Sequence, residues 1–322
     1  MAMRRHNIYK RSGAMNIIDK KFFDLADEIR RTGETELYLK IKSSFDALPA
    51  ATKKSLATFF SQYGYWGGLD PAGGVYEEIE LKAAALSRHI DDFEWLYGRL
   101  ADFRSKKVLF SVLSNWYRYD FDSPAQSKEY CFDDYFDLDL VKCSKDEVIA
   151  DLGAYIGDSV VSYLINYGAD CYKKIYCYEI TPEIFAALRE TLSRFERIDF
   201  RLKGVADKKG VMRLSPCAAS SSANTLADSG DVEVEVTTLD DDIAEPLTMI
   251  KADIEGSEYK ALLGAARHIR EDRPKLLISV YHNNEDLWRI PRLIDSLSSG
   301  YTFYLRHKGS PLYPTEITLL AL

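Results

Sequence analysis

The stretch Asp151-Leu152-Gly153-Ala154-Tyr155-Ile156-Gly157-Asp158-Ser159 decides the fold. It follows a short apolar run at residues 148–150 and precedes a segment with apolar residues at helical spacing. A strand that passes through a glycine-rich turn into a helix is the first unit of a doubly wound α/β sheet. We therefore expect a parallel sheet to begin at Val148.

Strand and helix patterns alternate along the rest of the chain. Gly168 is a typical helix stop, and Thr181-Pro182 is a typical helix start. Further strands are expected at 175–178, 200–202, 247–252 and 276–281, with a helix from about residue 257 to 269. Two β-like runs, 302–305 and 315–320, close the chain. This alternation predicts a doubly wound, Rossmann-like α/β sheet with an antiparallel C-terminal hairpin.

The first part of the chain has a helical texture instead. Apolar residues such as Phe22, Ala26 and Ile29 recur at helical offsets, and a glycine-rich break at 64–74 interrupts the pattern. The basic residues near the start precede no apolar stretch of the kind found in secretory signals. We expect a flexible N-terminal arm at 1–16, a helical N-terminal domain at 17–129 and the α/β domain at 130–322.

Composition narrows the class of protein. The chain has 322 residues and a net charge of −8, with 42 basic against 50 acidic residues, which disfavours a nucleic acid as the main partner. No apolar run approaches the ~20 residues of a membrane span. The five cysteines form no CxxC pair, so neither a disulfide framework nor a zinc site is expected, and a reducing cytoplasm fits best.

Two acidic residues mark where a ligand would bind. In a doubly wound sheet, ligands lie beyond the carboxyl ends of the strands where the strand order reverses. Asp151 ends the first strand, and Glu179 ends the second, about where a carboxylate could accept from both hydroxyls of a ribose. Gly153 and Gly157 form GxxxG and not the GxGxxG of dinucleotide sites. A glycine-rich turn alone is as typical of tight packing as of binding, but the strand-end acid favours binding.

These residues resemble the FkbM-type methyltransferases, which methylate hydroxyl oxygens using S-adenosylmethionine. The resemblance covers roughly the last 175 residues and runs through 151–159, Tyr178-Glu179, Thr238-Leu-Asp240, Ile250-Lys-Ala-Asp-Ile-Glu-Gly256-Ser-Glu258, Ser279-Val-Tyr-His282, Asp286-Leu-Trp-Arg-Ile-Pro291, Phe303-Tyr-Leu-Arg-His307 and Glu316. It implies that Glu179 holds the ribose, that the turn wraps the methionine part, and that Val205 or Ala206 flanks the adenine. The expected cofactor-binding residues are Asp151, Gly153, Ala154, Gly157, Asp158, Ser159, Glu179, Val205, Ala206 and Asp253.

The acceptor would meet the cofactor where the later strands end. Methyl transfer to oxygen needs the acceptor aligned near the methyl carbon and a group that helps remove the hydroxyl proton. Lys251 and Asp253 are two residues apart and so share one face of a strand. His282, which follows the next strand, has a near-neutral ordinary pKa and is the best placed base. Asp253, His282 and Lys251 are therefore the expected catalytic residues.

Each of these assignments has a plainer alternative. His282 is as easily a hydrogen-bonded structural histidine, and Lys251 is more often a neutralising partner of nearby acids than a catalytic group. Asp158 could simply cap the helix that follows, and Glu258 could suit the dipole of a helix start. A magnesium site is the weaker alternative, and its candidate oxygen ligands are Asp253, Glu255, Asn283 and Asn284. Their spacing does not match that of a dedicated cation loop, so no metal is predicted.

The acceptor cannot be read from the sequence. The resemblance suggests a hydroxyl of a small molecule, with a sugar as first choice, and leaves the oligomeric state open. Aromatic residues of the helical half could stack on a sugar ring or simply fill a core; these are Tyr65, Trp66, Trp95 and Trp116. The small-residue loop 220–222 could be a linker or could cover the acceptor. A nicotinamide-dependent oxidoreductase and a non-catalytic binding module are the rival interpretations.

Overall fold

The computed structural model describes residues 15–132, 135–217, 220, 223–227 and 232–322. The predicted arm at 1–16 falls almost entirely outside these residues, as do Ser221 and Ser222 of the small-residue loop. The helices are α1 Ile17–Arg31, α2 Glu34–Asp46, α3 Ala50–Gln62, the 3-10 helix η1 Gly64–Trp66, α4 Glu77–Arg99, α5 Phe103–Arg118, α6 Asp122–Ser127, α7 Asp158–Tyr167, α8 Pro182–Thr191, α9 Leu239–Asp242, α10 Glu258–Leu263, α11 Ala266–Glu271 and α12 Asp286–Leu297.

The strands form three sheets. Their bounds are β1 Leu69–Asp70, β2 Val75–Tyr76, β3 Val148–Leu152, β4 Lys174–Glu179, β5 Ile198–Leu202, β6 Gly204–Val205, β7 Gly210–Ser215, β8 Thr225–Ala227, β9 Val232–Thr237, β10 Met249–Ala252, β11 Lys275–Ser279, β12 Phe303–His307 and β13 Ile317–Ala321. The main sheet has seven strands in the order β12-β13-β11-β10-β3-β4-β5. The segments β11, β10, β3, β4 and β5 are parallel, and β13 runs antiparallel to both β11 and β12.

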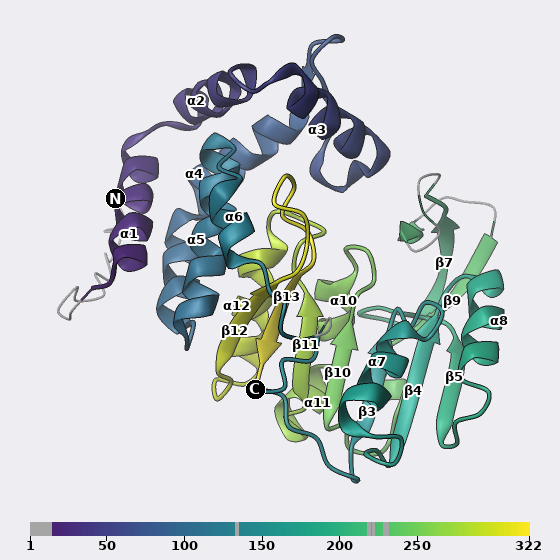
Figure 1. Ribbon diagram of the computed structural model, residues 1–322. Helices are drawn as coiled ribbons and strands as arrows, with labels where there is room; N and C mark the ends of the chain where they lie inside the picture. The colour runs from purple at the N-terminus through teal and green to yellow at the C-terminus, as the bar shows by residue number, and fades with distance from the viewer. Residues whose placement is uncertain (1–14, 133–134, 218–219, 221–222, 228–231) are drawn as a thin grey trace, which may run out of the picture.

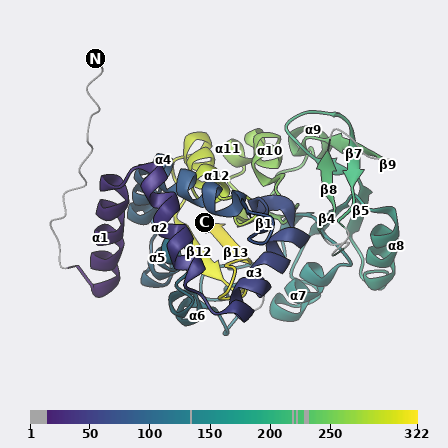
Figure 2. The same cartoon turned by 90° about the horizontal axis from the view of Figure 1, so that it is seen from above.

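The main sheet confirms the predicted doubly wound α/β fold. Figure 2 shows α10, α11 and α12 on one side of it and α7 on the other. The chain passes outward from β3 to β4 and β5, and then returns to add β10 on the other side of β3. The strand order therefore reverses beside β3, which is where doubly wound sheets bind ligands.

The helix expected at residues 257–269 is interrupted. It consists of α10 and α11, which are separated at Gly264. A Cβ at Gly264 would lie 2.0 Å from the backbone oxygen of Ala206. The chain passes another backbone segment too closely here for a larger residue, which explains the glycine.

A second sheet, which the sequence did not reveal, stands beside the main one. It has four strands in the order β6-β9-β7-β8. The strands β6 and β8 have only two and three residues. Segments this short are below the length at which alternation of apolar and polar residues can be recognised.

The helical half packs against the β12 edge of the main sheet. The backbone N–H of Ala101 donates to the Phe303 oxygen at 3.0 Å, and the N–H of Leu305 donates to Ser105 Oγ at 2.9 Å. One hydrophobic core contains residues of α1, α4, α5, β12 and α12. Figure 1 shows α1, α2 and α3 as an arch beside this edge. The boundary predicted between residues 129 and 130 stays a prediction.

Candidate active site

A cleft of about 270 Å³ lies at the carboxyl ends of β3, β4 and β10. Seven residues predicted for the site line it: Gly153, Asp158, Ser159, Glu179, Val205, Lys251 and Asp253. Five others do not belong to its lining: Asp151, Ala154, Gly157, Ala206 and His282. The structure therefore brings the first group of predicted residues together around one cleft, and the second group lies behind or beside its wall.

The two glycines of the turn are needed for packing. Gly153 has a φ of +74°, and a Cβ there would lie 1.9 Å from the backbone oxygen of Asp253. Gly157 has a φ of +90°, and a Cβ there would lie 3.0 Å from Leu192 Cγ. Gly157 also occupies the N-cap position of α7, so Asp158 is the first residue of the helix and not its cap. The tight turn brings β3 and β10 together, and Gly153 itself reaches the cleft.

Asp151 and Lys251 form a buried ion pair beneath the cleft. Lys251 Nζ lies 3.0 Å from Asp151 Oδ1 and donates to the Gly153 oxygen at 2.8 Å. Ser159 Oγ donates to Asp151 Oδ2 at 2.5 Å. Burial alone would lower the pKa of Lys251, but the charges of Asp151 and Asp253 outweigh burial and raise it. These contacts favour the neutralising role for Lys251, because its charge is already committed to an acid.

Glu179 is held at the end of β4 with one oxygen in use. Its Oε1 accepts from the backbone N–H groups of Ile180 and Thr181, both at 2.8 Å. Burial raises the pKa of Glu179, and the donors of Thr181 and Ile180 oppose that rise. The carboxylate is thus fixed through Oε1 in the lining of the cleft.

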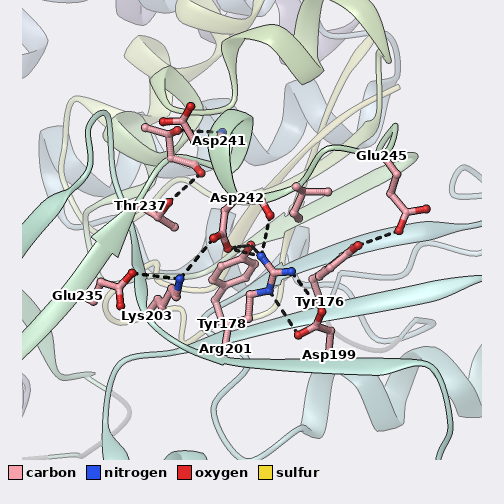
Figure 3. Close-up of polar contacts among 12 residues, drawn as sticks. Tyr176, Tyr178, Asp199, Arg201, Lys203, Glu235, Thr237, Asp241, Asp242 and Glu245 are labelled. Carbon is pink, nitrogen blue, oxygen red and sulfur yellow. Dashed lines mark hydrogen bonds and ion pairs between the residues drawn. The ribbon is translucent and has the colours of Figure 1, made fainter.

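An ionic network supports the wall beneath Glu179 (Figure 3). Arg201 of β5 contacts Asp242 of α9 and donates to Asp199 Oδ2 at 3.2 Å. Tyr178 donates to Asp242 Oδ2 at 2.8 Å, and Lys203 Nζ lies 3.4 Å from Asp242 Oδ1. Both Tyr178 and Lys203 line the cleft. The network fixes Tyr178 within β4 and Lys203, which connects β5 of the main sheet to β6 of the second one.

The opposite end of the cleft is acidic and phenolic. Tyr135 donates to Asp253 Oδ2 at 2.5 Å. Glu255, Glu316 and Tyr281 line the same end. Burial, followed by the negative charge of Asp253, raises the pKa of Glu316 to about 7. This end therefore offers several hydrogen-bond acceptors to a ligand that carries hydroxyl groups.

His282 lies behind this end, with 1% of its side chain exposed. Its Nδ1 lies 3.0 Å from Glu258 Oε1, and its Nε2 lies 3.1 Å from Glu255 Oε2 and 3.5 Å from Asp253 Oδ1. Burial would lower the pKa of His282, but the surrounding carboxylates raise it well above its ordinary value. A ring that holds its proton cannot accept another, so these contacts disfavour the predicted role of His282 as the base.

Residues 151–308 match the family model of the methyltransferase FkbM domain. The chain carries an FkbM methyltransferase domain. The structure is similar to an FkbM methyltransferase from Methylobacillus flagellatus KT, with a TM-score of 0.65 and 28% identity over 78% of this chain. The match spans 63% of that chain, which is less than two thirds of its length. S-adenosylmethionine is accordingly the cofactor of the domain.

More distant likenesses extend over about half of the chain. A putative methyltransferase from Streptococcus mutans, solved with S-adenosylhomocysteine, is 13% identical over 56% of this chain and 91% of its own, with a TM-score of 0.37. Fibrillarin from Aeropyrum pernix, solved with S-adenosylmethionine, is 14% identical over 57% of this chain and 70% of its own, with a TM-score of 0.35. No curated protein matches the sequence significantly.

Two of the four singled-out aromatic residues contact Tyr281 or His282, beside the FkbM domain's cleft. Trp66 Nε1 donates to the Tyr281 oxygen at 2.7 Å, and the Tyr65 ring stands edge-on to the His282 ring at 5.7 Å. Trp116 packs edge-on against a phenylalanine of α4, and Trp95 stacks on arginine side chains. Of these four aromatic residues, Tyr65 and Trp66 are therefore the two that contact residues next to the cleft. Among the helices that the structure describes, none is long and apolar enough to cross a membrane.

Sequence reasoning missed several residues that line the FkbM domain's cleft. Tyr135 lies in the connector before β3, and Asn224 and Leu226 come from the second sheet and the loop before it. No local pattern marks these positions, because the long-range pairing of strands brings them to the cleft. Glu316 had a signal, since it closes the chain of FkbM-like motifs, but its role in the site was not predicted.

Proposed function

We propose that the chain transfers the methyl group of S-adenosylmethionine to a hydroxyl oxygen of a small molecule, with a sugar as first choice. The observation that carries this proposal is the acidic and phenolic end of the cleft. Carboxylates accept hydrogen bonds from hydroxyl groups, and the carboxylates of Asp253, Glu255 and Glu316 all line the cleft. The net charge of −8 supports a small molecule over a nucleic acid.

The proposed orientation of the cofactor follows the cleft from end to end. Glu179 Oε2 accepts from the ribose, and Val205, which is buried beside it in β6, packs against the adenine. The Gly153 turn and Ser159 take the methionine part. This orientation directs the methyl group toward Asp253, at the end where the carboxylates gather.

Asp253 is the proposed contact with the acceptor hydroxyl. Tyr135 fixes its Oδ2, whereas its Oδ1 has no hydrogen-bond partner among the residues that the structure describes. A carboxylate held in this way keeps a defined position in the lining of the cleft, which is the requirement for aligning an acceptor near the methyl carbon. His282 takes a supporting role here, because its charged ring balances the neighbouring acids.

Replacement of Asp253 by asparagine tests the proposal. Transfer of labelled methyl groups from S-adenosylmethionine to a panel of sugars and other polyols should identify an acceptor. With that acceptor, Asp253→Asn should slow turnover by about 10²–10⁴-fold, the usual contribution of a positioned proton-transfer group. Affinity for S-adenosylhomocysteine, measured by isothermal titration calorimetry, should change far less.

The matched control is Asp241→Asn, which makes the same change at a half-exposed aspartate whose nearest cation is Lys209, outside the cleft. The control should behave as the unaltered protein does. Equal turnover in both variants would contradict the assignment of Asp253. Methyl transfer only to nitrogen or carbon acceptors would contradict the proposed O-methylation.

A further inference from the structure

We propose that Asp253, Glu258 and His282 form a binding site for a divalent cation at the acceptor end of the cleft. Each offers one ligand atom, and the three atoms lie within 4.8 Å of one another. A metal bound to carboxylate and imidazole ligands lies about 2.0–2.2 Å from each of them. Ligand atoms on opposite sides of one ion are thus a little over 4 Å apart, so slight side-chain movement would bring all three into contact with it.

Unsatisfied polar atoms point to the ligand. Among the described residues, Asp253 Oδ1 and Glu258 Oε2 are buried and accept no hydrogen bond. The side chains of Glu258 and His282 are 0% and 1% exposed. Buried polar atoms without partners are rare in proteins because each costs the free energy of its lost hydration. A cation would satisfy both oxygens and would bind one ring nitrogen of His282, which releases its proton when it becomes a ligand.

The second oxygen of each carboxylate is already in use. Glu258 Oε1 accepts from the backbone N–H of Ile254 at 2.8 Å, and Asp253 Oδ2 accepts from Tyr135. Supporting bonds of this kind orient the ligands of metal sites while the other oxygen stays available. His282 lies beside these acids because β11, which precedes it, pairs with β10.

The charges around the cluster also favour a cation. Glu255 Oε2 lies 3.1 Å from His282 Nε2, so three carboxylates surround one imidazole. Even with a charged ring, the cluster keeps two excess negative charges. Lys251, the buried lysine nearest to it in the described site, is paired with Asp151. A divalent cation would neutralise the excess.

A donor set of carboxylates and one imidazole suits Mn²⁺ and related divalent ions. The ion would lie next to the residues that face the acceptor, where it could bind the acceptor oxygen and favour loss of its proton. That last step rests on the proposed methyl transfer, whereas the binding of the cation does not.

Manganese binding by the full chain tests the site. After removal of metals with a chelator, Mn²⁺ is titrated in and the free aquo ion is followed by electron paramagnetic resonance. The unaltered protein should bind one Mn²⁺ per chain, and Glu258→Gln should weaken binding at least 10-fold. Glutamine keeps an oxygen that accepts from the Ile254 N–H, so the fold should be unchanged. Its amide nitrogen replaces the free oxygen and cannot bind the metal.

The matched control is Glu285→Gln, which removes an exposed carboxylate paired with Arg289 near His282. It should bind Mn²⁺ as the unaltered protein does. Asp253→Asn, at the rim of the cleft, provides a second variant if Glu258→Gln is poorly folded by circular dichroism. Absence of bound Mn²⁺, or equal binding by Glu258→Gln, Asp253→Asn and the control, would overturn the site and leave His282 as a charged partner of the acids.

Titration of S-adenosylhomocysteine into the same preparations separates the two proposals. Binding of S-adenosylhomocysteine without Mn²⁺ binding contradicts the metal site alone. Binding of Mn²⁺ without S-adenosylhomocysteine supports the metal site and contradicts the proposed methyl transfer.

Discussion

The chemical role of a residue near the cleft depends on its ion-pair and hydrogen-bond partners as well as on its place in a strand. Glu179 ends β4, as its place in the sequence predicted, whereas Asp151 is followed by one more residue of β3, Leu152. Asp151 is occupied by Lys251 and Ser159, whereas Glu179 lines the cleft. The difference arises because Lys251 extends from the neighbouring strand β10 toward β3, which no local pattern in the sequence could show.

Glu179→Gln should weaken binding of S-adenosylhomocysteine by roughly 10- to 100-fold, the effect of losing a charge-assisted hydrogen bond of about 1.5–3 kcal/mol. Glutamine retains an oxygen for the Ile180 and Thr181 N–H groups, so the melting temperature without ligand should stay nearly unchanged. Calorimetric titration and thermal unfolding measure the two effects. Glu183→Gln, on the exposed side of α8, is the control. A variant that binds normally but melts much earlier would make Glu179 a structural residue.

The turn after β3 passes very close to the end of β10. The backbone of Gly153 and the end of β10 are so close that no side chain fits between them. This contact aligns the strand ends that form the floor of the cleft. The stability of the turn and the shape of the ligand site are therefore coupled.

Gly153→Ala should destabilise the protein by several kcal/mol or prevent folding, because its Cβ would overlap the Asp253 oxygen. Gly74→Ala is the matched control, since Gly74 also has a φ of +74° but nothing lies within 4 Å of an added Cβ. That control should lose only the ~1–3 kcal/mol of backbone strain. Thermal unfolding compares the two variants. Equal losses would show that strain alone, and not the close approach, requires glycine at 153.

Elements marked by local sequence signals could be predicted, whereas contacts between distant parts of the chain could not. The strands β3, β4 and β10 and the helices α7 and α8 were predicted because apolar periodicity, Gly168 and Pro182 are local signals. The second sheet was missed because β6 and β8 are too short to show a pattern, and the alternating residues of β9, Val232–Thr237, were not recognised as a strand. The cleft was located by the general rule for doubly wound sheets, whereas the carboxylates around His282 were not, because α10 and β11 bring them together only in the folded chain.

At the scale of the whole molecule, the helical half and the FkbM domain share one hydrophobic core. Polar contacts reinforce it: Arg306 of β12 contacts Asp102, the N-cap of α5, at 2.8 Å and Asp137 at 2.6 Å. Trp66 reaches Tyr281 from above the cleft. The helical half therefore contributes both to the stability of the sheet edge and to the surroundings of the acceptor end.

His307, at the end of β12, should make the free energy of unfolding depend on pH. Burial, followed by the charge of Lys128, lowers the pKa of His307 to about 4 from an ordinary value of 6.5. Between these values the unfolded chain binds the proton and the folded chain does not. The stabilising contribution of neutral His307 to the free energy of unfolding is therefore fully present above about pH 6.5. It falls by up to about 3 kcal/mol as the pH drops toward 4.

Urea unfolding at several pH values measures this effect. In His307→Gln the loss of stability between pH 6.5 and 4 should be smaller than in the unaltered protein. His89→Gln, which removes a partly exposed histidine of α4, should leave the loss in place. An identical pH dependence in His307→Gln and the unaltered protein would contradict the assignment.

The central claim is that the cleft at the ends of β3, β4 and β10 binds S-adenosylmethionine, and titration calorimetry tests it most directly. S-adenosylmethionine, S-adenosylhomocysteine and NAD⁺ are each titrated into the full chain. We predict that the first two bind at one site per chain and that NAD⁺ gives no heat of binding, because the turn after β3 is GxxxG and not the pyrophosphate-binding GxGxxG. Tight binding of NAD⁺ with no response to S-adenosylmethionine or S-adenosylhomocysteine would contradict the account.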